Sequence, residues 1–404
     1  MRVLIYSVSA GAGHVRAAEA LSTAFKRYHS DVEVEHVDVM KLVPASFKNA
    51  YVDSYIQLVN TLPSVWGWLY NRSDKIPQTS ALASVRKFVQ KLNTQKIIDH
   101  AIAWKPDAIL ATHFLPAEIF SDLARKRRSS TRVLKRNAGP DGAFDPKLGV
   151  VVTDHDVHQL WIYPNVDRYY TASDEIAYLL AERTGPEFSI RPTGIPCDPI
   201  FGELIDQPAR QRLKKVLGLD GAPSPTLLLN AHGCGVSGAT AARALGGVVN
   251  NLLKKGPPKT ILIICGRTEK IKETLAESIT VPAGSVVKFY GYVDNMHELM
   301  GIADLSVTKP GGLTTSECLA RSLPMVLVSP IPGQEERNAE MLLENGCAVL
   351  ARTPAALAYK LETLLNDAPR LQRMRENCRR TGHPNAAREI VTDIMELVKA
   401  KAKI

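Results

Sequence analysis

Short runs of apolar, often β-branched residues alternate with helical patterns along this whole sequence, and no other feature constrains the fold as much. Such an order is typical of βα units on a parallel sheet whose two faces are both covered. The sequence therefore predicts an α/β protein. The expected strands are Val3–Val8, Val32–Val37, Ala108–Thr112, Val150–Thr153 and Arg168–Thr171 in the first half, and Thr226–Asn230, Thr260–Cys265, Val286–Tyr290, Leu305–Thr308 and Met325–Val328 in the second.

The two strand series and the length predict two domains. At 404 residues the chain exceeds the size, about 250–300 residues, at which one hydrophobic core stops growing. A Pro/Gly-rich passage near residue 196 separates the series, so we expect Rossmann-like doubly wound domains over 1–196 and 197–385. They would face each other across a cleft at the strand carboxyl ends. A helix over about 386–400, within the final segment 386–404, is expected to return to the first domain.

Composition and charge limit the function classes. Hydrophobic residues make up 45% and charged residues 23%, which excludes a disordered or fibrous protein. No segment approaches the ~20 apolar residues of a membrane span, and six cysteines without a C-x-x-C pair predict reduced thiols. The net charge is +9, and residues 1–150 hold 21 basic against 13 acidic side chains. An anionic partner should therefore meet the first domain. Charge alone leaves lipid and nucleic acid open, but no nucleic-acid motif is present.

A glycine loop, Ser9-Ala-Gly-Ala-Gly-His14, lies between the first strand and its helix. Arg16 replaces the third glycine of a dinucleotide fingerprint, which disfavours nicotinamide binding even though Asp38 ends the second strand. An imidazole near the positive end of a helix dipole should have a lowered pKa, so His14 would be neutral and able to accept a proton. A helix-capping or solvent-facing histidine is the alternative.

Two loops of the second half also follow expected strands. In Lys309-Pro-Gly-Gly-Leu-Thr-Thr-Ser-Glu317, backbone N–H groups and the hydroxyls of Thr314 and Thr315 can surround a phosphate at a helix start, and Glu317 can bind a ribose diol. The alternative is a plain Pro-Gly-Gly turn. In the segment 329–338, Gln334, Glu335 and Asn338 offer amide and carboxylate groups that can bind sugar hydroxyls. The alternative is that they only form the solvated first turn of a helix.

An aromatic stretch and a basic run mark the first half. The stretch contains Phe47, Tyr51, Tyr55, Trp66, Trp68 and Tyr70 among apolar residues, and such a segment can lie in a lipid headgroup layer without crossing it. A core role for these aromatics is the alternative. The basic run, residues 125–136, can dock anionic lipid at about 1 kcal/mol per charge, or form a solvated face.

Several motifs occur in the order seen in the diacylglycerol glycosyltransferases. They are Gly11-Ala-Gly-His14, Val152-Thr-Asp-His-Asp-Val-His158-Gln-Leu-Trp161, Thr193-Gly-Ile-Pro196, Cys265-Gly-Arg267, Gly291-Tyr-Val293, Lys309-Pro-Gly-Gly312 with Glu317, and Pro332-Gly-Gln-Glu-Glu-Arg-Asn338. The chain thus resembles glycosyltransferase family 28, in particular the processive diacylglycerol glucosyltransferases and monogalactosyldiacylglycerol synthases. The usual Gly-Gly-Gly-His reads Gly-Ala-Gly-His here, and the loop at 230–237 differs as well, which leaves the sugar open.

The resemblance implies the two-domain GT-B architecture, with a nucleotide sugar in the second domain and a lipid acceptor in the first. His14 matches the proposed general base. The donor would contact the diphosphate loop Gly311, Gly312, Leu313, Thr314 and Thr315, the ribose ligand Glu317, the sugar ligands Gln334 and Glu335, and Gly266, Arg267, Tyr292 and Val293 beside the nucleotide. The acceptor side would include Gly13, Asp154 and His158, together with Trp66 and Trp68 of the aromatic stretch.

The expected reaction is an inverting transfer of a hexose from a UDP-sugar to a diacylglycerol-type lipid, giving a β-glycolipid. His14 would take the hydroxyl proton, while helix dipole, backbone amides and Arg267 would stabilise the leaving diphosphate without a metal or other cofactor. Asp154-His-Asp156 has D-x-D spacing but lies in the acceptor half. Alternatives are N-acetylglucosamine transfer to a polyprenyl-linked precursor, a nucleotide-sugar 2-epimerase, and a non-catalytic lipid- or nucleotide-binding protein.

These inferences also predict where the protein works. Its partners would be a UDP-hexose, a diacylglycerol-type lipid and an anionic membrane surface, and no nucleic acid. We expect a cytoplasmic enzyme attached peripherally to the cytosolic face of a membrane.

Overall fold

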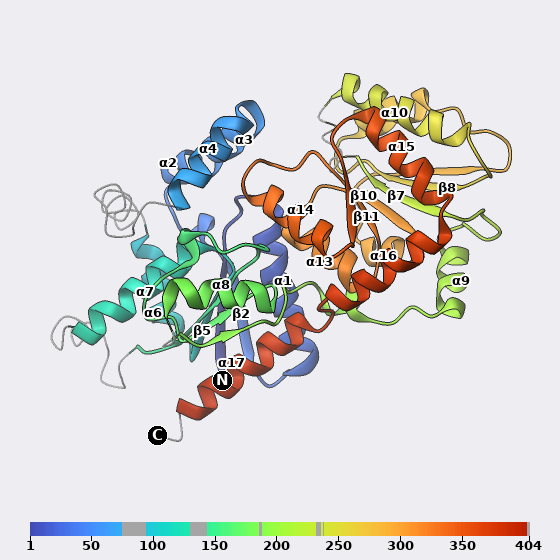
Figure 1. Cartoon of the computed structure of the whole chain (residues 1–404). Coiled ribbons are helices and arrows are strands. Elements are labelled where there is room, and N and C mark those ends of the chain that lie inside the picture. Colours follow the sequence, from blue (N-terminus) through green and yellow to red (C-terminus); the bar gives the residue numbers. More distant parts are fainter. Residues whose placement is uncertain (75–93, 130–143, 186–187, 232–235, 237, 402–404) are drawn as a thin grey trace. The chain divides into compact units, whose positions relative to one another are not determined.

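The computed structural model describes residues 1–74, 94–129, 144–185, 188–231, 236 and 238–401 (Figure 1). Two compact units emerge. Unit 1 comprises residues 1–199, 331–334 and 385–404, and unit 2 comprises residues 200–330 and 335–384. The short segment 331–334 therefore belongs to unit 1 although the chain on either side of it belongs to unit 2.

Unit 1 is built on a parallel six-stranded sheet in the order β2-β1-β3-β4-β5-β6. Its strands are β1 (Arg2–Ser7), β2 (Glu33–Asp38), β3 (Ala108–Ala111), β4 (Lys147–Val151), β5 (Arg168–Tyr170) and β6 (Ile190–Arg191). The α-helices are α1 (Ala12–Tyr28), α2 (Ala45–Lys48), α3 (Ser54–Thr61), α4 (Pro63–Asp74), α6 (Gln95–Trp104), α7 (Phe114–Ser129), α8 (Asp174–Thr184) and α17 (Ala386–Lys401), and short helical turns are η1 (Val39–Lys41), η2 (Asn49–Asp53) and η4 (Gln159–Trp161).

Unit 2 repeats the plan in the order β12-β11-β10-β7-β8-β9, again all parallel. Its strands are β7 (Thr226–Asn230), β8 (Thr260–Ile264), β9 (Val286–Tyr290), β10 (Leu305–Thr308), β11 (Met325–Val328) and β12 (Ala348–Ala351). The helices are α9 (Gln207–Val216), α10 (Ala239–Leu253), α11 (Glu269–Ser278), α12 (Met296–Ile302), α13 (Gly312–Ala320), α14 (Gln334–Glu344), α15 (Pro354–Leu365) and α16 (Ala368–Thr381), and the turn η5 (Pro199–Gly202) stands at the start of the unit.

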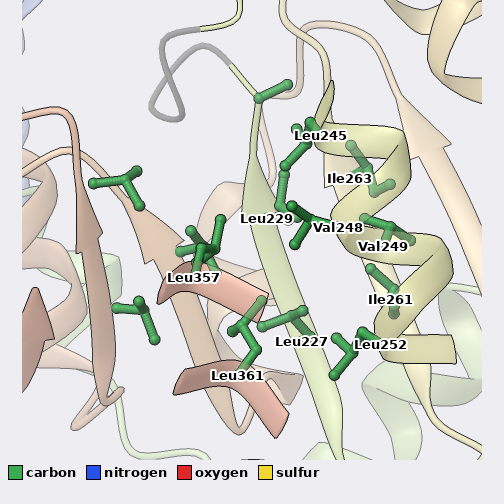
Figure 2. Close-up of a cluster of buried hydrophobic side chains, with 14 of the residues drawn as sticks. Leu227, Leu229, Leu245, Val248, Val249, Leu252, Ile261, Ile263, Leu357 and Leu361 are labelled. Carbon is green, nitrogen blue, oxygen red and sulfur yellow. The ribbon is translucent and has the colours of Figure 1, made fainter. Parts of the chain in front are cut away.

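The cores follow from the apolar periodicity of the helices. In unit 2, α10 presents Leu245, Val248, Val249 and Leu252, one stripe of an α-helix, to β7 and β8 (Figure 2). Burial of each such side chain contributes about 1.5–3 kcal/mol. In unit 1, α1 and α17 pack on the same sheet face, where Leu21 and Phe25 lie in one cluster with Ile390 and Ile394. Since these side chains come from both ends of the sequence, the carboxyl-terminal helix is part of the unit 1 core.

The predicted α/β class is confirmed, and so are the ten strands, most of them to within a residue or two. The strand expected at Val150 begins earlier, at Lys147, because Lys147 pairs with Ala108 and its ammonium binds Asp167 at 2.8 Å. Two strands were not predicted. β6 has only two residues, and β12, Ala-Val-Leu-Ala, carries no β-specific pattern.

Strand order also marks where a site should form. In each sheet the chain first adds strands on one side of the first strand and then on its other side. The two neighbours are β2 and β3 for β1, and β8 and β10 for β7. In such sheets ligands bind beyond the carboxyl ends of the strands at this reversal. The loops after β1 and β3 carry His14 and His113, and the loop after β10 carries Lys309 to Gly311.

Candidate functional site

A cavity of about 360 Å³ lies in unit 1 beyond the carboxyl ends of β1, β3 and β4. Its lining is mainly aromatic and apolar, with a few polar groups. The lining residues are Ala10, His14, Tyr51, Trp66, Leu69, Tyr70, Ser73, His113, Phe114, Asp154, His158, Leu160, Trp161 and Gln334. An apolar cavity with a small number of placed polar groups is the usual form of a small-molecule site.

His14 lines this cavity from the first turn of α1, and its hydrogen bonds determine its tautomer. Its Nδ1 lies 2.9 Å from the carbonyl oxygen of Thr112 and 2.9 Å from the hydroxyl of Thr153. A carbonyl oxygen only accepts, so Nδ1 carries the proton and donates to Thr112. Nε2 of the neutral ring is then the basic nitrogen. The Thr112 hydroxyl donates in turn to the backbone oxygen of His14 at 2.9 Å, which holds the ring in place.

Burial lowers the pKa of the His14 imidazole to about 4, although the hydrogen bond to Thr112 opposes this shift. The direction agrees with the sequence prediction, but the main cause is burial and not the helix dipole. His113 packs edge-on against His14, with ring centroids 4.6 Å apart. Burial, with a smaller contribution from His14, holds the pKa of His113 well below its usual value. The Leu115 N–H donates to Nδ1 of His113 at 3.0 Å, so this ring is protonated on Nε2.

Asp154 is the buried carboxylate of the cavity. Burial raises its pKa to about 6, and hydrogen bonds from Gln334 and Trp161 moderate the rise. The Gln334 side-chain amide donates directly to Oδ1 of Asp154. Gln334, which the sequence assigned to the donor sugar, therefore lies in one cavity with Asp154 and His158, which the sequence assigned to the acceptor side. The part of the chain that the structure describes contains no group of three or more His, Cys, Asp and Glu able to hold a metal ion.

His158 joins its own turn, η4, to α4, because each of its ring nitrogens bonds one of the two. Nδ1 accepts the Leu160 N–H at 3.1 Å, so Nε2 carries the proton and donates to the Tyr70 carbonyl at 3.0 Å. The rings of His158 and Tyr70 also lie in contact, with centroids 4.3 Å apart and planes tilted by 37°. At the end of α4, Asp74 accepts the Gln159 N–H and binds Arg183. The geometry of His158 is therefore that of a positioning residue.

The segment 331–334 packs closely on α4. A Cβ at Gly67 would lie 2.6 Å from Cβ of Pro332, and one at Gly333 would lie 2.7 Å from the Tyr70 ring. Gly333 also has φ +88°, a conformation that favours glycine. These two glycines allow the close approach that brings Gln334 to Asp154.

The aromatic stretch divides between interior and surface. Phe47 and Tyr70 are buried and Trp66 lines the cavity, whereas Trp68 is 59% exposed and does not line it. Leu62, Val65 and Leu69 are also exposed, and the Arg72 guanidinium lies over the Trp68 ring at 5.3 Å. The core interpretation holds for Phe47 and Tyr70, whereas the headgroup-layer interpretation of the exposed Trp68 stays a prediction. The side chain of Tyr55 lies outside the described residues.

The glycine loop before α1 is open. Gly11 precedes α1 with φ +101°, and a Cβ at either Gly11 or Gly13 would meet no atom within 4 Å. Asp38 accepts the Ser9 N–H at 3.1 Å and the Met40 N–H at 3.1 Å, so it fixes this loop from the end of β2.

In unit 2, Gly311 precedes α13 and leaves the first N–H groups of that helix, from Gly312, Leu313 and Thr314, at its amino end. The Thr315 hydroxyl instead donates to the carbonyl oxygens of Gly311 and Gly312, each at 3.0 Å. It is buried and bonded within its own helix, while Thr314 is half-buried. Only Thr314 therefore keeps the accessibility that the sequence assigned to both hydroxyls.

Other predicted donor residues lie around this loop. A Cβ at Gly311 would be 3.8 Å from Oε1 of Glu335, so Glu335 lies beside the loop. Asn338 donates to the Pro310 carbonyl at 3.0 Å and fixes the turn, and Glu317 is buried in α13. Glu335 thus lies at the α13 loop in unit 2, whereas its neighbour Gln334 lies in the unit 1 cavity.

Arg267 and Tyr292 form a separate pair in unit 2, because the guanidinium lies 4.6 Å from the ring centroid. Gly266, with φ +68°, and Gly291 bring the two loops together, and Val293 follows half-buried. Both paired side chains are exposed, as expected of groups that cover a ligand.

Two features named from the sequence cannot be described. The side chains of 125–136 lie outside the described residues, and so does most of the loop at 230–237, with Cys234. The five described cysteines are buried and are not joined in disulfide bonds.

Sequence reasoning missed His113 and Phe114, which line the cavity, and named Tyr51 only as part of the aromatic stretch. His113 and Phe114 directly follow the strand β3 next to β1, and position at that strand end was the one signal that could have identified them.

Comparisons with known proteins agree with this architecture. The monogalactosyldiacylglycerol (MGDG) synthase family model matches residues 14–197, and the glycosyl transferases group 1 model matches residues 248–381. Among solved structures, MnaA of S. aureus with UDP gives a TM-score of 0.61 at 13% identity, over 98% of this chain and 97% of that one. MurG of Acinetobacter baumannii gives 0.59 at 17% identity, over 98% and 99%. The UDP-GlcNAc 2-epimerase of Neisseria meningitidis, bound to UDP-GlcNAc, gives 0.57 at 14%, over 98% and 100%.

The chain is therefore a glycosyltransferase with the GT-B fold of two Rossmann-like doubly wound domains. Its resemblance to glycosyltransferase family 28 is confirmed by relatives along its length. The processive diacylglycerol beta-glucosyltransferase of Staphylococcus epidermidis is 27% identical over 98% of this chain and 93% of its own length. That of Bacillus subtilis is 28% identical over 100% and 97%. No described helix is long and apolar enough to cross a membrane.

Proposed function

We propose that this enzyme transfers a hexose from a UDP-sugar to a diacylglycerol-type lipid with inversion, giving a β-glycolipid. The observation that carries the proposal is the state of His14. Its Nδ1 is committed to Thr112, its ring is neutral at physiological pH, and it lines an aromatic cavity suited to a lipid.

His14 acts as the general base. As the acceptor hydroxyl attacks the anomeric carbon, Nε2 takes its proton, and Nδ1–H shares the resulting positive charge with the Thr112 carbonyl and the Thr153 hydroxyl. A protein base on the attacking hydroxyl supports attack opposite the leaving diphosphate. An α-linked UDP-sugar then yields a β-linkage.

The donor binds unit 2. The first N–H groups of α13 receive the diphosphate, Glu317 the ribose, and Arg267 with Tyr292 the nucleotide. Helix dipole and Arg267 neutralise the charge of the leaving group, so the mechanism needs no metal. Support for a UDP-sugar comes from relatives of the same fold, such as MnaA with UDP. Support for a diacylglycerol acceptor comes from the Staphylococcus and Bacillus relatives, which are processive diacylglycerol beta-glucosyltransferases.

The enzyme works at an anionic membrane surface from the cytoplasmic side. Four apolar side chains, Leu62, Val65, Trp68 and Leu69, are exposed on α4 and just before it. Arg72 lies over Trp68, so a cation stands beside this apolar face. Trp and Arg together suit the headgroup layer, where an amphipathic helix rests without crossing.

One assay tests the function. Purified protein is incubated with diacylglycerol liposomes and UDP-glucose, UDP-galactose or UDP-N-acetylglucosamine, with EDTA in a parallel set, and lipids are identified by mass spectrometry. A β-glycosyl diacylglycerol formed equally with and without EDTA is expected. Isomerised nucleotide sugar without glycolipid would indicate a 2-epimerase. Sugar transfer only to an added polyprenyl phosphate acceptor would contradict the diacylglycerol assignment.

A further inference from the structure

A second cavity, of about 570 Å³, lies in unit 2 between α9 and α16 (both labelled in Figure 1). Its floor is formed by Pro225, just before β7, and Asp304, just before β10. The proposed diphosphate loop follows the carboxyl end of β10, whereas Pro225 and Asp304 precede the amino ends of β7 and β10. The cavity and the loop therefore lie at opposite ends of the strands of the same sheet. This cavity, here called the α9–α16 groove, is therefore separate from the proposed donor site.

Both helices present a regular stripe to the groove. α9 contributes residues 207, 210, 211 and 214, and α16 contributes residues 368, 371, 372 and 375, each in the i, i+3, i+4, i+7 spacing of one helix face. In each stripe the last position is cationic, Lys214 and Arg375, and Gln211 and Gln372 precede these cations by one turn. The groove thus combines cations with neutral amide donors.

Positive charge exceeds negative charge in the groove. Its lining has three cations, Arg210, Lys214 and Arg375, but one carboxylate, Asp304. Asp304 is already engaged, because it accepts Arg210 at 2.7 Å and the Thr226 N–H at 2.8 Å. Arg375 reaches the same carboxylate only at 3.4 Å.

The positive charge of the Lys214 ammonium is only weakly compensated by its neighbours. Within the described residues, the Lys214 ammonium donates one long hydrogen bond, to the Ser224 hydroxyl at 3.4 Å. Burial, and to a smaller extent the neighbouring Arg210, lower the pKa of Lys214, and Asp304 opposes this shift without cancelling it. An ion network built for stability alone would match these charges, since an unpaired half-buried cation costs free energy.

We propose that the α9–α16 groove binds a small soluble phosphomonoester. The dianion would bind between Lys214 and Arg375, which supply an ammonium and a planar guanidinium, the two groups that proteins use for phosphate. The organic part would lie against Leu371 and the glutamine amides, and the volume is within the range of small-molecule sites. This inference is independent of the proposed transferase reaction.

Isothermal titration calorimetry on the full chain tests the proposal at constant ionic strength, set with sodium chloride. The titrants are glycerol 3-phosphate, inorganic phosphate and vesicles containing phosphatidate, each with and without saturating UDP. The variants are Lys214→Gln and Arg375→Gln, and Arg379→Gln is the matched control. Arg379 is one turn further along α16, 74% exposed and paired with Glu376, and it does not line the groove.

We expect saturable binding of glycerol 3-phosphate that is tighter than that of inorganic phosphate and unchanged by UDP. Lys214→Gln and Arg375→Gln should each weaken it at least tenfold, as expected for a charged hydrogen bond, and Arg379→Gln less than twofold. Should Arg375→Gln fail to fold, Lys214→Gln decides, because its single long contact makes misfolding unexpected. Absence of saturable binding, displacement by UDP, wild-type affinity of Lys214→Gln, or binding to vesicles alone would each overturn the proposal.

Discussion

The cavity of unit 1 and the α13 loop of unit 2 both follow the carboxyl ends of parallel strands, but different chemical groups form them. The cavity relies on buried side chains, His14, Asp154 and His158, each fixed by hydrogen bonds. The α13 loop relies on backbone N–H groups at a helix start, with the half-buried Thr314 in that first turn. Proton chemistry and pH dependence should therefore come from the cavity. Single side-chain changes at the α13 loop should mainly alter donor affinity.

The strongest contrast is expected for His14→Ala. Loss of the base should lower kcat about 10³-fold, in the range of general-base catalysis, while UDP affinity measured by calorimetry stays within twofold. His383→Ala, an exposed histidine of unit 2, is the control and should keep full activity. Activity above a tenth of the wild type in His14→Ala would remove His14 as the base.

Asp154 should make the stability of the protein depend on pH. Its pKa is raised from 3.8 to about 6 in the fold, so the native state binds more protons than the unfolded state between these values. Its contribution is favourable below pH 3.8 and is lost as pH rises through 6. Asp154→Asn should therefore stabilise the protein more at pH 7.5 than at pH 5, by about 1.4 kcal/mol, because one pKa unit corresponds to about 1.4 kcal/mol and close to half of the shift is already expressed at pH 5. Chemical denaturation at the two pH values measures this. An equal effect at both would contradict it.

Adjacent residues Gln334 and Glu335 offer the sharpest division between the two sites. Gln334→Ala removes the amide that binds Asp154, so kcat/KM for the lipid should fall about tenfold with a smaller change in KM for the UDP-sugar. Glu335→Ala, beside Gly311, should raise KM for the UDP-sugar instead. Steady-state kinetics with each substrate varied separately decides. A larger effect of Gln334→Ala on KM for the UDP-sugar than on kcat/KM for the lipid would assign Gln334 to the donor site.

The smallest effect is expected at Thr315. Its hydroxyl donates to carbonyl groups of its own helix, so Thr315→Val should change UDP affinity less than twofold. Thr314→Val, one position earlier and half-buried, should weaken UDP binding by about threefold to tenfold. Equal losses in both variants would mean that both hydroxyls reach the nucleotide.

Local pattern was enough to predict the fold and the chain positions of the loops. Apolar runs such as Leu305–Thr308 mark buried strands directly, since the period of side chains and the burial of both faces leave a signature in sequence. β12 was missed because four residues of Ala, Val and Leu suit a helix equally well.

The composition of the cavity could not be predicted in the same way. The bond from Gln334 to Asp154 joins positions 180 residues apart, and nothing local shows that 331–334 packs with unit 1. His113 has no motif around it and gains its meaning only from the pairing of β1 with β3. The pKa of His14 depends on what buries it, which spacing alone does not reveal.

The place of α17 in the core of unit 1 has a consequence for synthesis. Ile390, Val391 and Ile394 are fully buried with residues of β1 and α1, yet they leave the ribosome only after the whole of unit 2. Unit 2 is complete at Pro384, so it can fold while the first 199 residues still expose an apolar sheet face. The amino-terminal domain usually folds first, but here the core of unit 2 can be completed before the core of unit 1. A nascent chain of this protein should remain dependent on chaperones until α17 emerges.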